Sequence, residues 1–177
     1  MNDTFQYRLT KSKKIEIAEN LIEILQKDAE IKPQTSTFIS NWILTTSDEK
    51  RKAFFDVWEI VLNNYLPSER PILFRSCQRV SKKNKIASFT GRLECAKRFS
   101  GGKGTLIICD TNETLKFEEF SNSDNYTKSF YPLFSVLIKA KNSGGSGFSE
   151  RILNDYIGEN EYIMKVDMEN MQGLKWK

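Results

Sequence analysis

The sequence contains no histidine among its 177 residues and only three cysteines. The absence of histidine excludes Ser-His-Asp and Cys-His catalytic triads and the usual histidine zinc sites. Cys77, Cys95 and Cys109 are odd in number and lack the close spacing of a zinc or redox motif. We interpret them as free, mostly buried thiols. Any catalysis must therefore rest on carboxylates, hydroxyls, lysine or arginine, and we expect no metal.

Long apolar runs are also missing from the chain. No run approaches the roughly 20 residues that span a bilayer. The residues from Met1 to Gln6 have no hydrophobic core like that of a signal peptide. We therefore expect a cytoplasmic chain with no membrane partner. Hydrophobic residues at 39% and charged residues at 28% are typical of a globular protein, and the length predicts one domain over 1–177.

Residues 1–68 are expected to form a helical N-terminal part. Apolar residues at spacings of three and four predict a helix over 11–27. Pro33 interrupts the pattern, and a short apolar stretch predicts a second helix over 38–44. Thr46 and Glu49 form a capping-box pair before a third helix. The two clearest apolar stripes are Ile15, Ala18, Leu21, Ile22 and Leu25, and then Phe54, Val57, Trp58, Val61 and Tyr65.

Residues 69–177 read mainly as short strands between turns. We predict strands over 72–77, 85–89, 104–109, 133–139 and 162–166, and a short helix over 94–100 with Ala96 and Phe99 on its inner side. The segment 142–147 is a Gly/Ser loop that lacks the Lys-Ser/Thr of a P-loop. The predicted fold class is α+β, with the helical N-terminal part packed on a mixed, mainly antiparallel sheet.

The positive charge of the chain is unevenly distributed. Nine basic residues lie between Arg75 and Lys103 against one acidic residue, Glu94, so this basic segment carries a net charge of +8. Such a segment attracts phosphates on a dinucleotide or a nucleic acid. A solvated face is the alternative, above all for Lys82, Lys83 and Lys85. The basic residues are Arg75, Arg79, Lys82, Lys83, Lys85, Arg92, Lys97, Arg98 and Lys103.

Two polar features stand in otherwise apolar predicted strands. Arg75 lies within Ile72-Leu73-Phe74-Arg75-Ser76-Cys77, where it could hold a phosphate or satisfy backbone carbonyls. The hydroxyls of Ser88 and Thr90 are two residues apart, so they point to one side of a strand and can bind a ligand or orient a carboxylate. Thr90 could equally cap the helix that follows.

A pair of carboxylates precedes the last predicted strand. Glu159 and Glu161 flank Asn160 in Gly158-Glu-Asn-Glu-Tyr162. On an extended chain this spacing puts both acids on one face, about 7 Å apart at their α-carbons. Like charges held close raise one pKa, which favours a general base beside an ionised electrostatic stabiliser. Glu-x-Glu is also common on solvated edges.

The order of strand arginine, Ser-x-Thr and Glu-x-Glu resembles the arginine-serine-glutamate class of mono-ADP-ribosyltransferases, which includes many bacterial toxins and phage-encoded enzymes. The resemblance covers roughly residues 71–168, and its most specific parts are Ser88-Phe89-Thr90 with the following helix and Glu159-Asn160-Glu161. It implies a split-sheet core of the ADP-ribosyltransferase type and NAD as the substrate. Gly91 departs from the pattern, because many members carry a further small polar residue there.

The resemblance also implies a role for each matching residue. Arg75, beside Ser76, would hold an NAD phosphate, while Ser88 would brace the site and orient Glu161. Glu161 would bind the ribose next to nicotinamide, and Glu159 would prepare the acceptor. Breaking the nicotinamide–ribose bond builds positive charge on the sugar, which a fixed carboxylate stabilises. Candidate aromatic residues for gripping nicotinamide are Phe89, Phe99, Tyr126, Phe130 and Tyr131.

The acceptor of the ADP-ribose stays open at this level. In the family, Glu-x-Glu goes most often with arginine, so protein arginine is favoured. The basic segment would instead suit DNA or RNA as acceptor. A non-catalytic, basic nucleic-acid-binding module is the competing function. A toxin-like enzyme would also have an antitoxin or other neutralising partner, which these residues do not identify.

Overall fold

Three helices form the N-terminal part of the chain. A computed structural model describes residues 7–46, 52–78, 85–112, 130–166 and 172–176. Helix α1 spans Lys11–Gln26, α2 spans Pro33–Leu44 and α3 spans Lys52–Asn64. The side chain of Thr10 accepts a hydrogen bond from the Lys13 backbone N–H and so caps α1. Of the predicted capping-box pair Thr46 and Glu49, Glu49 lies outside the described residues.

Two predictions for these helices need correction. Helix α2 begins at Pro33 and not at Phe38. A proline suits the first helical position, where its missing N–H leaves no hydrogen bond unmade. In α1, Ala18 and Leu21 are buried as predicted, but Ile15 is 37% exposed and Ile17 and Ile24 take the inner positions. The stripe of α3 is buried as predicted.

The strands form one six-stranded sheet in the order β4-β5-β2-β1-β3-β6. Every pairing between the described strands is antiparallel, so the expectation of a mixed sheet was wrong in this respect. The strand predicted over 72–77 is present with the same bounds, three other predicted strands are present with shifts of one residue at their ends, and β4 and β6 were not predicted. The strands are β1 Ile72–Cys77, β2 Lys85–Thr90, β3 Thr105–Asp110, β4 Phe130–Pro132, β5 Glu161–Val166 and β6 Gln172–Lys175.

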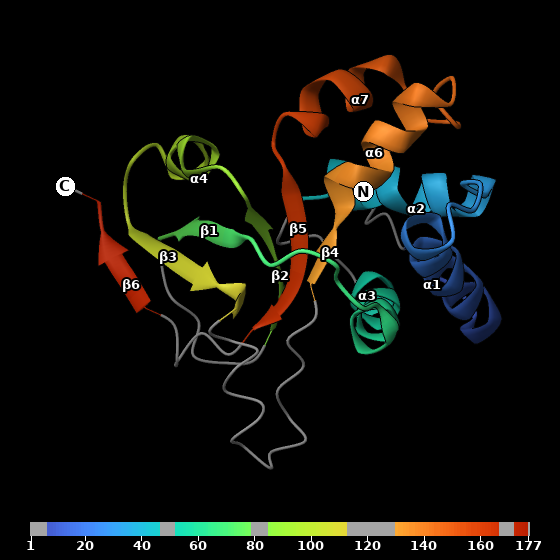
Figure 1. The fold of residues 1–177 in the computed structure, drawn as a ribbon, viewed down its shortest axis with the longest axis horizontal. Coiled ribbons are helices and arrows are strands. Elements are labelled where there is room, and N and C mark those ends of the chain that lie inside the picture. Colours follow the sequence, from blue (N-terminus) through green and yellow to red (C-terminus); the bar gives the residue numbers. More distant parts are fainter. Residues whose placement is uncertain (1–6, 47–51, 79–84, 113–129, 167–171, 177) are drawn as a thin grey trace, which may run out of the picture.

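The remaining helices are α4 Leu93–Ser100, α6 Leu133–Asn142 and α7 Glu150–Ile157. Helix α6 overturns the strand predicted over 133–139. A short apolar run fits a buried strand or a buried helix equally well, and here Leu133, Val136, Leu137 and Ala140 are buried at helical spacing. Figure 1 shows α1, α2, α3, α6 and α7 beside the β4–β5 side of the sheet, and α4 over its other half.

Two groups of buried residues hold these layers together. The larger group joins α1, α2 and α3 to residues beyond the helical part, including Tyr131, Leu133 and Ile163. The smaller group lies along the sheet and includes Leu73, Phe89, Ile107 and Met164. The helical part therefore packs against β4, β5 and α6 through the larger group, a core that the two parts share. None of the helices in the described ranges is both long and apolar enough to cross a membrane.

Candidate active site

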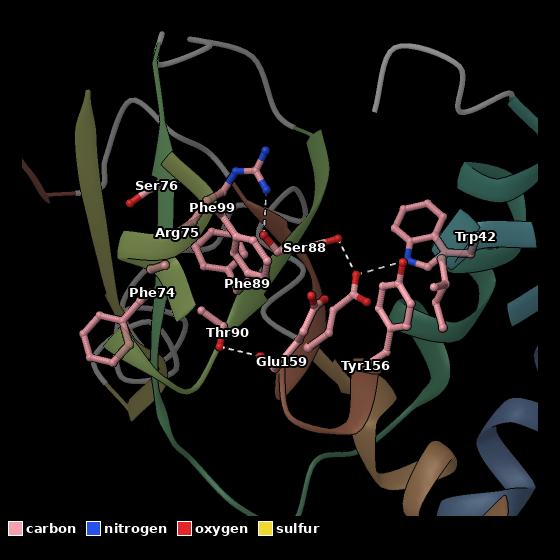
Figure 2. A pocket seen from close by; sticks show the side chains of 13 residues that line it. Trp42, Phe74, Arg75, Ser76, Ser88, Phe89, Thr90, Phe99, Tyr156 and Glu159 are labelled. Atoms are coloured by element: carbon pink, nitrogen blue, oxygen red, sulfur yellow. Dashed lines mark hydrogen bonds between the residues drawn. The ribbon is translucent and has the colours of Figure 1, made fainter. Parts of the chain in front are cut away.

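A cavity of about 360 Å³ lies where the helical part meets the sheet. Its walls come from α2, β1, β2, α4, α7, the turn over 158–160 and the first residue of β5. Eight of the residues that the sequence singled out as catalytic or NAD-binding line it (Figure 2), namely Arg75, Ser76, Ser88, Phe89, Thr90, Phe99, Glu159 and Glu161. The lining residues are Trp42, Ile43, Phe74, Arg75, Ser76, Ser88, Phe89, Thr90, Ala96, Phe99, Tyr156, Glu159 and Glu161.

The carboxylate of Glu161 is fixed by two hydrogen bonds to the same oxygen. Strands β2 and β5 pair with Thr90 opposite Glu161 and Ser88 opposite Ile163, so Ser88 and Glu161 share one face of the sheet. The Ser88 hydroxyl donates to Oε1 at 2.5 Å, and the Trp42 indole Nε1–H donates to the same atom at 3.1 Å. Within the described residues Oε2 makes no hydrogen bond, so it is the oxygen available to a ligand.

The spacing predicted that Glu159 lies beside Glu161 on an extended strand, and this prediction was wrong. Glu159 belongs to the turn over 158–160, where Asn160 takes a left-handed φ of 51°. Asparagine tolerates this conformation better than most residues. A Cβ on Gly91 would lie 2.2 Å from Asn160 Oδ1, and Gly91 N–H donates to Asn160 O at 3.2 Å. Gly91, which lacks a side chain, thus allows the two turns to approach closely.

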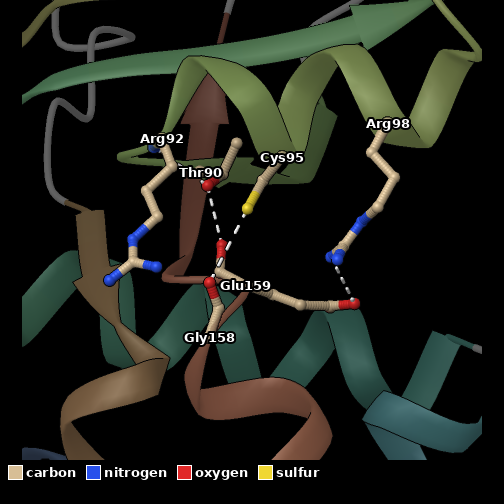
Figure 3. A network of polar contacts seen from close by, with 6 residues as sticks. All are labelled: Thr90, Arg92, Cys95, Arg98, Gly158 and Glu159. Carbon is tan, nitrogen blue, oxygen red and sulfur yellow. Dashed lines mark hydrogen bonds and ion pairs between the residues drawn. The ribbon is translucent and has the colours of Figure 1, made fainter.

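Thr90 connects the end of β2 to the same turn. Its hydroxyl donates to the backbone O of Glu159 at 2.7 Å and accepts from the Arg92 backbone N–H at 3.1 Å (Figure 3). The N-cap of α4 is Arg92, which makes no capping hydrogen bond with its side chain. Thr90 therefore acts neither as the helix cap nor as a direct carboxylate ligand. It holds the backbone that carries Glu159.

The environment of Glu159 disfavours its ionised form. Burial raises the pKa of Glu159 above its ordinary value, and the charges of Glu161 and Asp155 raise it further. Arg98 opposes this shift, because its Nη2 lies 3.5 Å from Glu159 Oε1 (Figure 3). The Arg98 side chain is 64% exposed, so solvent weakens this ion pair. The cavity thus has two carboxylates in different environments.

Arg75 reaches from β1 toward β2 across the cavity wall. Its Nη1 donates to the backbone O of Ser88 at 2.6 Å, while its buried Nε has no hydrogen-bond partner in the described part of the chain. Burial lowers the pKa of the Arg75 guanidinium, and Cys77 and Glu161 oppose that shift. The carbonyl contact fits the structural interpretation of Arg75. The unpaired Nε leaves this buried cation able to gain from a bound anion.

The other predicted NAD-binding residues, Ser76, Phe89 and Phe99, offer fewer unpaired polar groups to a ligand than Arg75 does. The Ser76 hydroxyl already accepts a hydrogen bond from Trp176 Nε1 at 2.9 Å. Phe89 is only 2% exposed and lines the cavity from the core side. Phe99 is 55% exposed, so its predicted place on the inner side of α4 was wrong, whereas Ala96 is buried. Arg98 covers the Phe99 ring, with its guanidinium carbon 5.3 Å from the ring centre.

Not every aromatic candidate for nicotinamide lies near the cavity. Phe130 and Tyr131 are core residues, and the Tyr131 hydroxyl donates to the backbone O of Leu21 at 2.5 Å. Tyr126 falls outside the described residues. Three aromatic residues that sequence reasoning missed, Trp42, Phe74 and Tyr156, do line the cavity.

Trp42 is the most informative residue that the sequence analysis missed. A tryptophan in an apolar stretch is typical of a core residue, and 119 positions separate it from Glu161. No local sequence signal links the two. The neighbouring Ile43 was missed for the same reason.

The basic segment contributes an exposed surface beside the cavity. Arg92, Lys97, Arg98 and Lys103 are exposed and lie on or next to α4. Arg79, Lys82 and Lys83 fall outside the described residues, and Arg75 lines the cavity. Among the residues described, no group of three or more histidine, cysteine, aspartate or glutamate side chains could hold a metal ion.

No protein-family model, curated protein or solved structure matches the chain. A function can therefore be inferred only from the chemistry that the cavity offers.

Proposed function

We propose that the chain is an NAD-dependent mono-ADP-ribosyltransferase. The observation that carries the proposal is the fixed Glu161 carboxylate in the cavity wall, held at Oε1 by Ser88 and Trp42 with Oε2 unbonded in the described structure. A carboxylate held in this way can accept a hydrogen bond from a ribose hydroxyl and stabilise positive charge on the sugar. Both tasks are needed when the nicotinamide–ribose bond breaks.

The reaction needs no metal and no histidine. Nicotinamide leaves with the electron pair of the broken bond and becomes neutral, so it needs little acid catalysis. The sugar becomes an oxocarbenium-like cation, as in glycoside cleavage, and a nucleophile from the acceptor then bonds to its anomeric carbon and loses a proton. In the proposal Glu161 stabilises the cation. Glu159, whose pKa is raised, takes the proton.

Arg75 and two aromatic rings complete the proposed NAD site. A dinucleotide carries two phosphates, and a buried guanidinium with an unpaired N–H favours such an anion. Nicotinamide is a flat ring that stacks well on an aromatic face. Phe99 and Tyr156 line the cavity without full burial, so their rings are open to such a contact.

Protein arginine is the first candidate acceptor. A free carboxylate two residues before Glu161 can pair with an incoming guanidinium and take its proton. In the structure Glu159 is already paired with the guanidinium of Arg98, which occupies the place that an arginine acceptor would take. Arg98 would have to move aside. Because its side chain is 64% exposed, breaking its ion pair with Glu159 costs little free energy.

Nucleic acid is the second candidate acceptor, and the surface around Arg98 favours it. Exposed Arg92, Lys97 and Lys103 accompany Arg98, and the exposed ring of Phe99 lines the cavity itself. Basic side chains beside an exposed aromatic ring are typical of sites that bind single-stranded nucleic acid. Such an acceptor would leave the Arg98–Glu159 pair intact.

The test uses NAD labelled in its adenylate part, with nicotinamide release measured in parallel. The pure protein is incubated with an arginine-rich peptide, with single-stranded DNA or with RNA, and transferred label is located by mass spectrometry. The proposal predicts nicotinamide release and a covalent product with one of these acceptors. Folded protein that neither binds NAD nor releases nicotinamide with any acceptor would refute it. Salt-sensitive nucleic-acid binding without NAD turnover would support the basic binding module instead.

A further inference from the structure

We infer that Trp42 is a positioning residue for Glu161, which makes helix α2 a working part of the site. This inference rests on the proposed NAD-cleaving function. It adds a second residue that orients the carboxylate, one that lies outside both the Ser-x-Thr and the Glu-x-Glu elements. The contact joins the helical part to the first residue of β5.

The geometry of the contact supports a specific role. The indole N–H and the Ser88 hydroxyl donate to the same oxygen, Glu161 Oε1, from two different elements. A single donor leaves a carboxylate free to rotate about its last side-chain bond. Two donors from different directions fix the carboxylate plane. With Oε1 saturated, Oε2 is the oxygen that remains for the substrate.

The indole itself has little freedom to move. Trp42 is 1% exposed, and its ring meets the rings of Phe54, Phe55 and Trp58 edge-on at centroid distances of 5.8, 6.2 and 5.6 Å. These partners all belong to α3. The packing of α2 on α3 thus determines where the N–H points, and through it where the Glu161 carboxylate sits. Groups that are preorganised in this way cost no reorganisation during the reaction.

The hydrogen bond from Trp42 could also serve only to satisfy a buried indole N–H. A second buried tryptophan in the same cluster provides a matched control for this purely structural explanation. Trp58 is buried in contact with Trp42, but its Nε1 has no hydrogen-bond partner in the described ranges. Phenylalanine at either position keeps an aromatic ring and removes the N–H. Only at position 42 does the change remove a donor to Glu161.

The kinetic test compares Trp42→Phe and Trp58→Phe for nicotinamide release, after circular dichroism and thermal melting show that both variants are folded. We expect Trp42→Phe to lower kcat by about 10- to 100-fold, as a small misplacement of a catalytic group does. The KM for NAD should stay nearly unchanged, because the lost interaction matters in the transition state. Trp58→Phe keeps a ring against the Trp42 indole and leaves the Trp42 N–H in place, so its kcat should fall much less than that of Trp42→Phe. Equal kcat values for the two variants would overturn the inference.

A second test does not depend on activity. The chain has three tryptophans, so a ¹H–¹⁵N spectrum contains three indole N–H signals, which Trp42→Phe and Trp58→Phe assign. In Glu161→Gln the loss of the carboxylate charge weakens the bond. The Trp42 signal should then move upfield more than those of Trp58 and Trp176. An unmoved Trp42 signal would contradict the contact, whereas wild-type protein that releases no nicotinamide would contradict the proposed function alone.

Discussion

The helical part and the cavity wall differ in how they place aromatic rings and charged groups. In the helices, Phe38, Trp42, Phe54 and Trp58 are at most 1% exposed and contact one another. The two buried atoms of the helices that lack a partner within the described residues, Thr35 Oγ1 and Trp58 Nε1, belong to neutral side chains. In the cavity wall, by contrast, one carboxylate oxygen and one guanidinium N–H lack partners within the described structure, and Phe99 is open to solvent.

This difference separates a region built for stability from a region built for binding. Satisfied, close-packed groups lower the free energy of the fold. Unpaired polar groups in a cavity cost stability and are retained where a ligand completes them. Changes in the first region should therefore lower stability without altering chemistry, and changes in the second should do the reverse. Trp42 belongs to both regions.

The largest expected effect on stability lies in α1. Leu21 is fully buried in the shared core and lies outside the lining of the cavity. Leu21→Ala should lower the free energy of unfolding by about 2–5 kcal/mol, because it removes buried methyl groups and leaves a cavity. Urea denaturation measures the loss. The kcat of the protein that remains folded should equal that of the wild type, and a lower kcat would break the separation of the two regions.

The largest expected effect on chemistry is at Glu161. Glu161→Gln keeps the shape of the side chain but removes the charge that stabilises the ribosyl cation. Both NAD hydrolysis and ADP-ribose transfer should fall by at least about 100-fold. Nicotinamide release with and without acceptor measures both. Full activity in this variant would refute the assignment of the site.

Glu159→Gln is expected to have a narrower effect. If Glu159 only prepares the acceptor, the variant should lose transfer to arginine while it still cleaves NAD slowly to water, because the cation is still stabilised. The same two assays, run beside Glu161→Gln, show whether NAD hydrolysis is retained when transfer is lost. Equal loss of both activities in both variants would contradict this division of labour.

Arg75→Ala should act on binding more than on folding. A charge-assisted pair with a phosphate contributes about 1.5–3 kcal/mol, so NAD affinity should fall by about 10- to 100-fold. Calorimetric titration with NAD gives the affinity, and thermal melting gives the stability. A collapse of stability with intact NAD affinity would mean that the contact with Ser88 O is the main role of Arg75.

The smallest expected effect is a pH shift caused by Arg98. The Arg98 charge lowers the pKa of Glu159, against burial and the charges of Glu161 and Asp155, which raise it. Arg98→Gln removes the lowering influence, so the pKa of Glu159 rises. Transfer that needs ionised Glu159 is lost as the pH falls through this pKa. The acidic limb of its rate profile should therefore move to higher pH.

The Arg98 shift should be small and should shrink in salt, because the pair is exposed. Arg98→Lys keeps the charge and serves as the control. NAD hydrolysis, which in the proposal does not need Glu159, should keep its profile. A shift toward lower pH in Arg98→Gln would contradict the electrostatic assignment.

Much of the fold was predictable where local pattern and packing agree. The stripe of α3 follows from apolar periodicity, because the helix buries one clear face. The strand Ile72–Cys77 follows from a short run of mostly apolar residues after Pro71, although only Leu73 in it is buried. Residues 133–139, which belong to α6, were mistaken for a strand because their apolar run shows no distinctive period over seven residues. Phe99 was predicted on the inner side of α4, but it is exposed. The sequence of a short helix does not determine which of its side chains a neighbouring layer covers.

The sequence by itself determined which chemical groups the protein can use. It has no histidine, and it places Arg75, Ser88 and Glu161 in or at the start of short strands. Only the tertiary structure decided how those groups meet. The β2–β5 register brings Ser88 to Glu161, the left-handed Asn160 turns Glu159 out of the strand, and α2 delivers the indole of Trp42. The reason is physical. Residue type is local, whereas a hydrogen bond across 119 positions exists only once the helices have packed against the sheet.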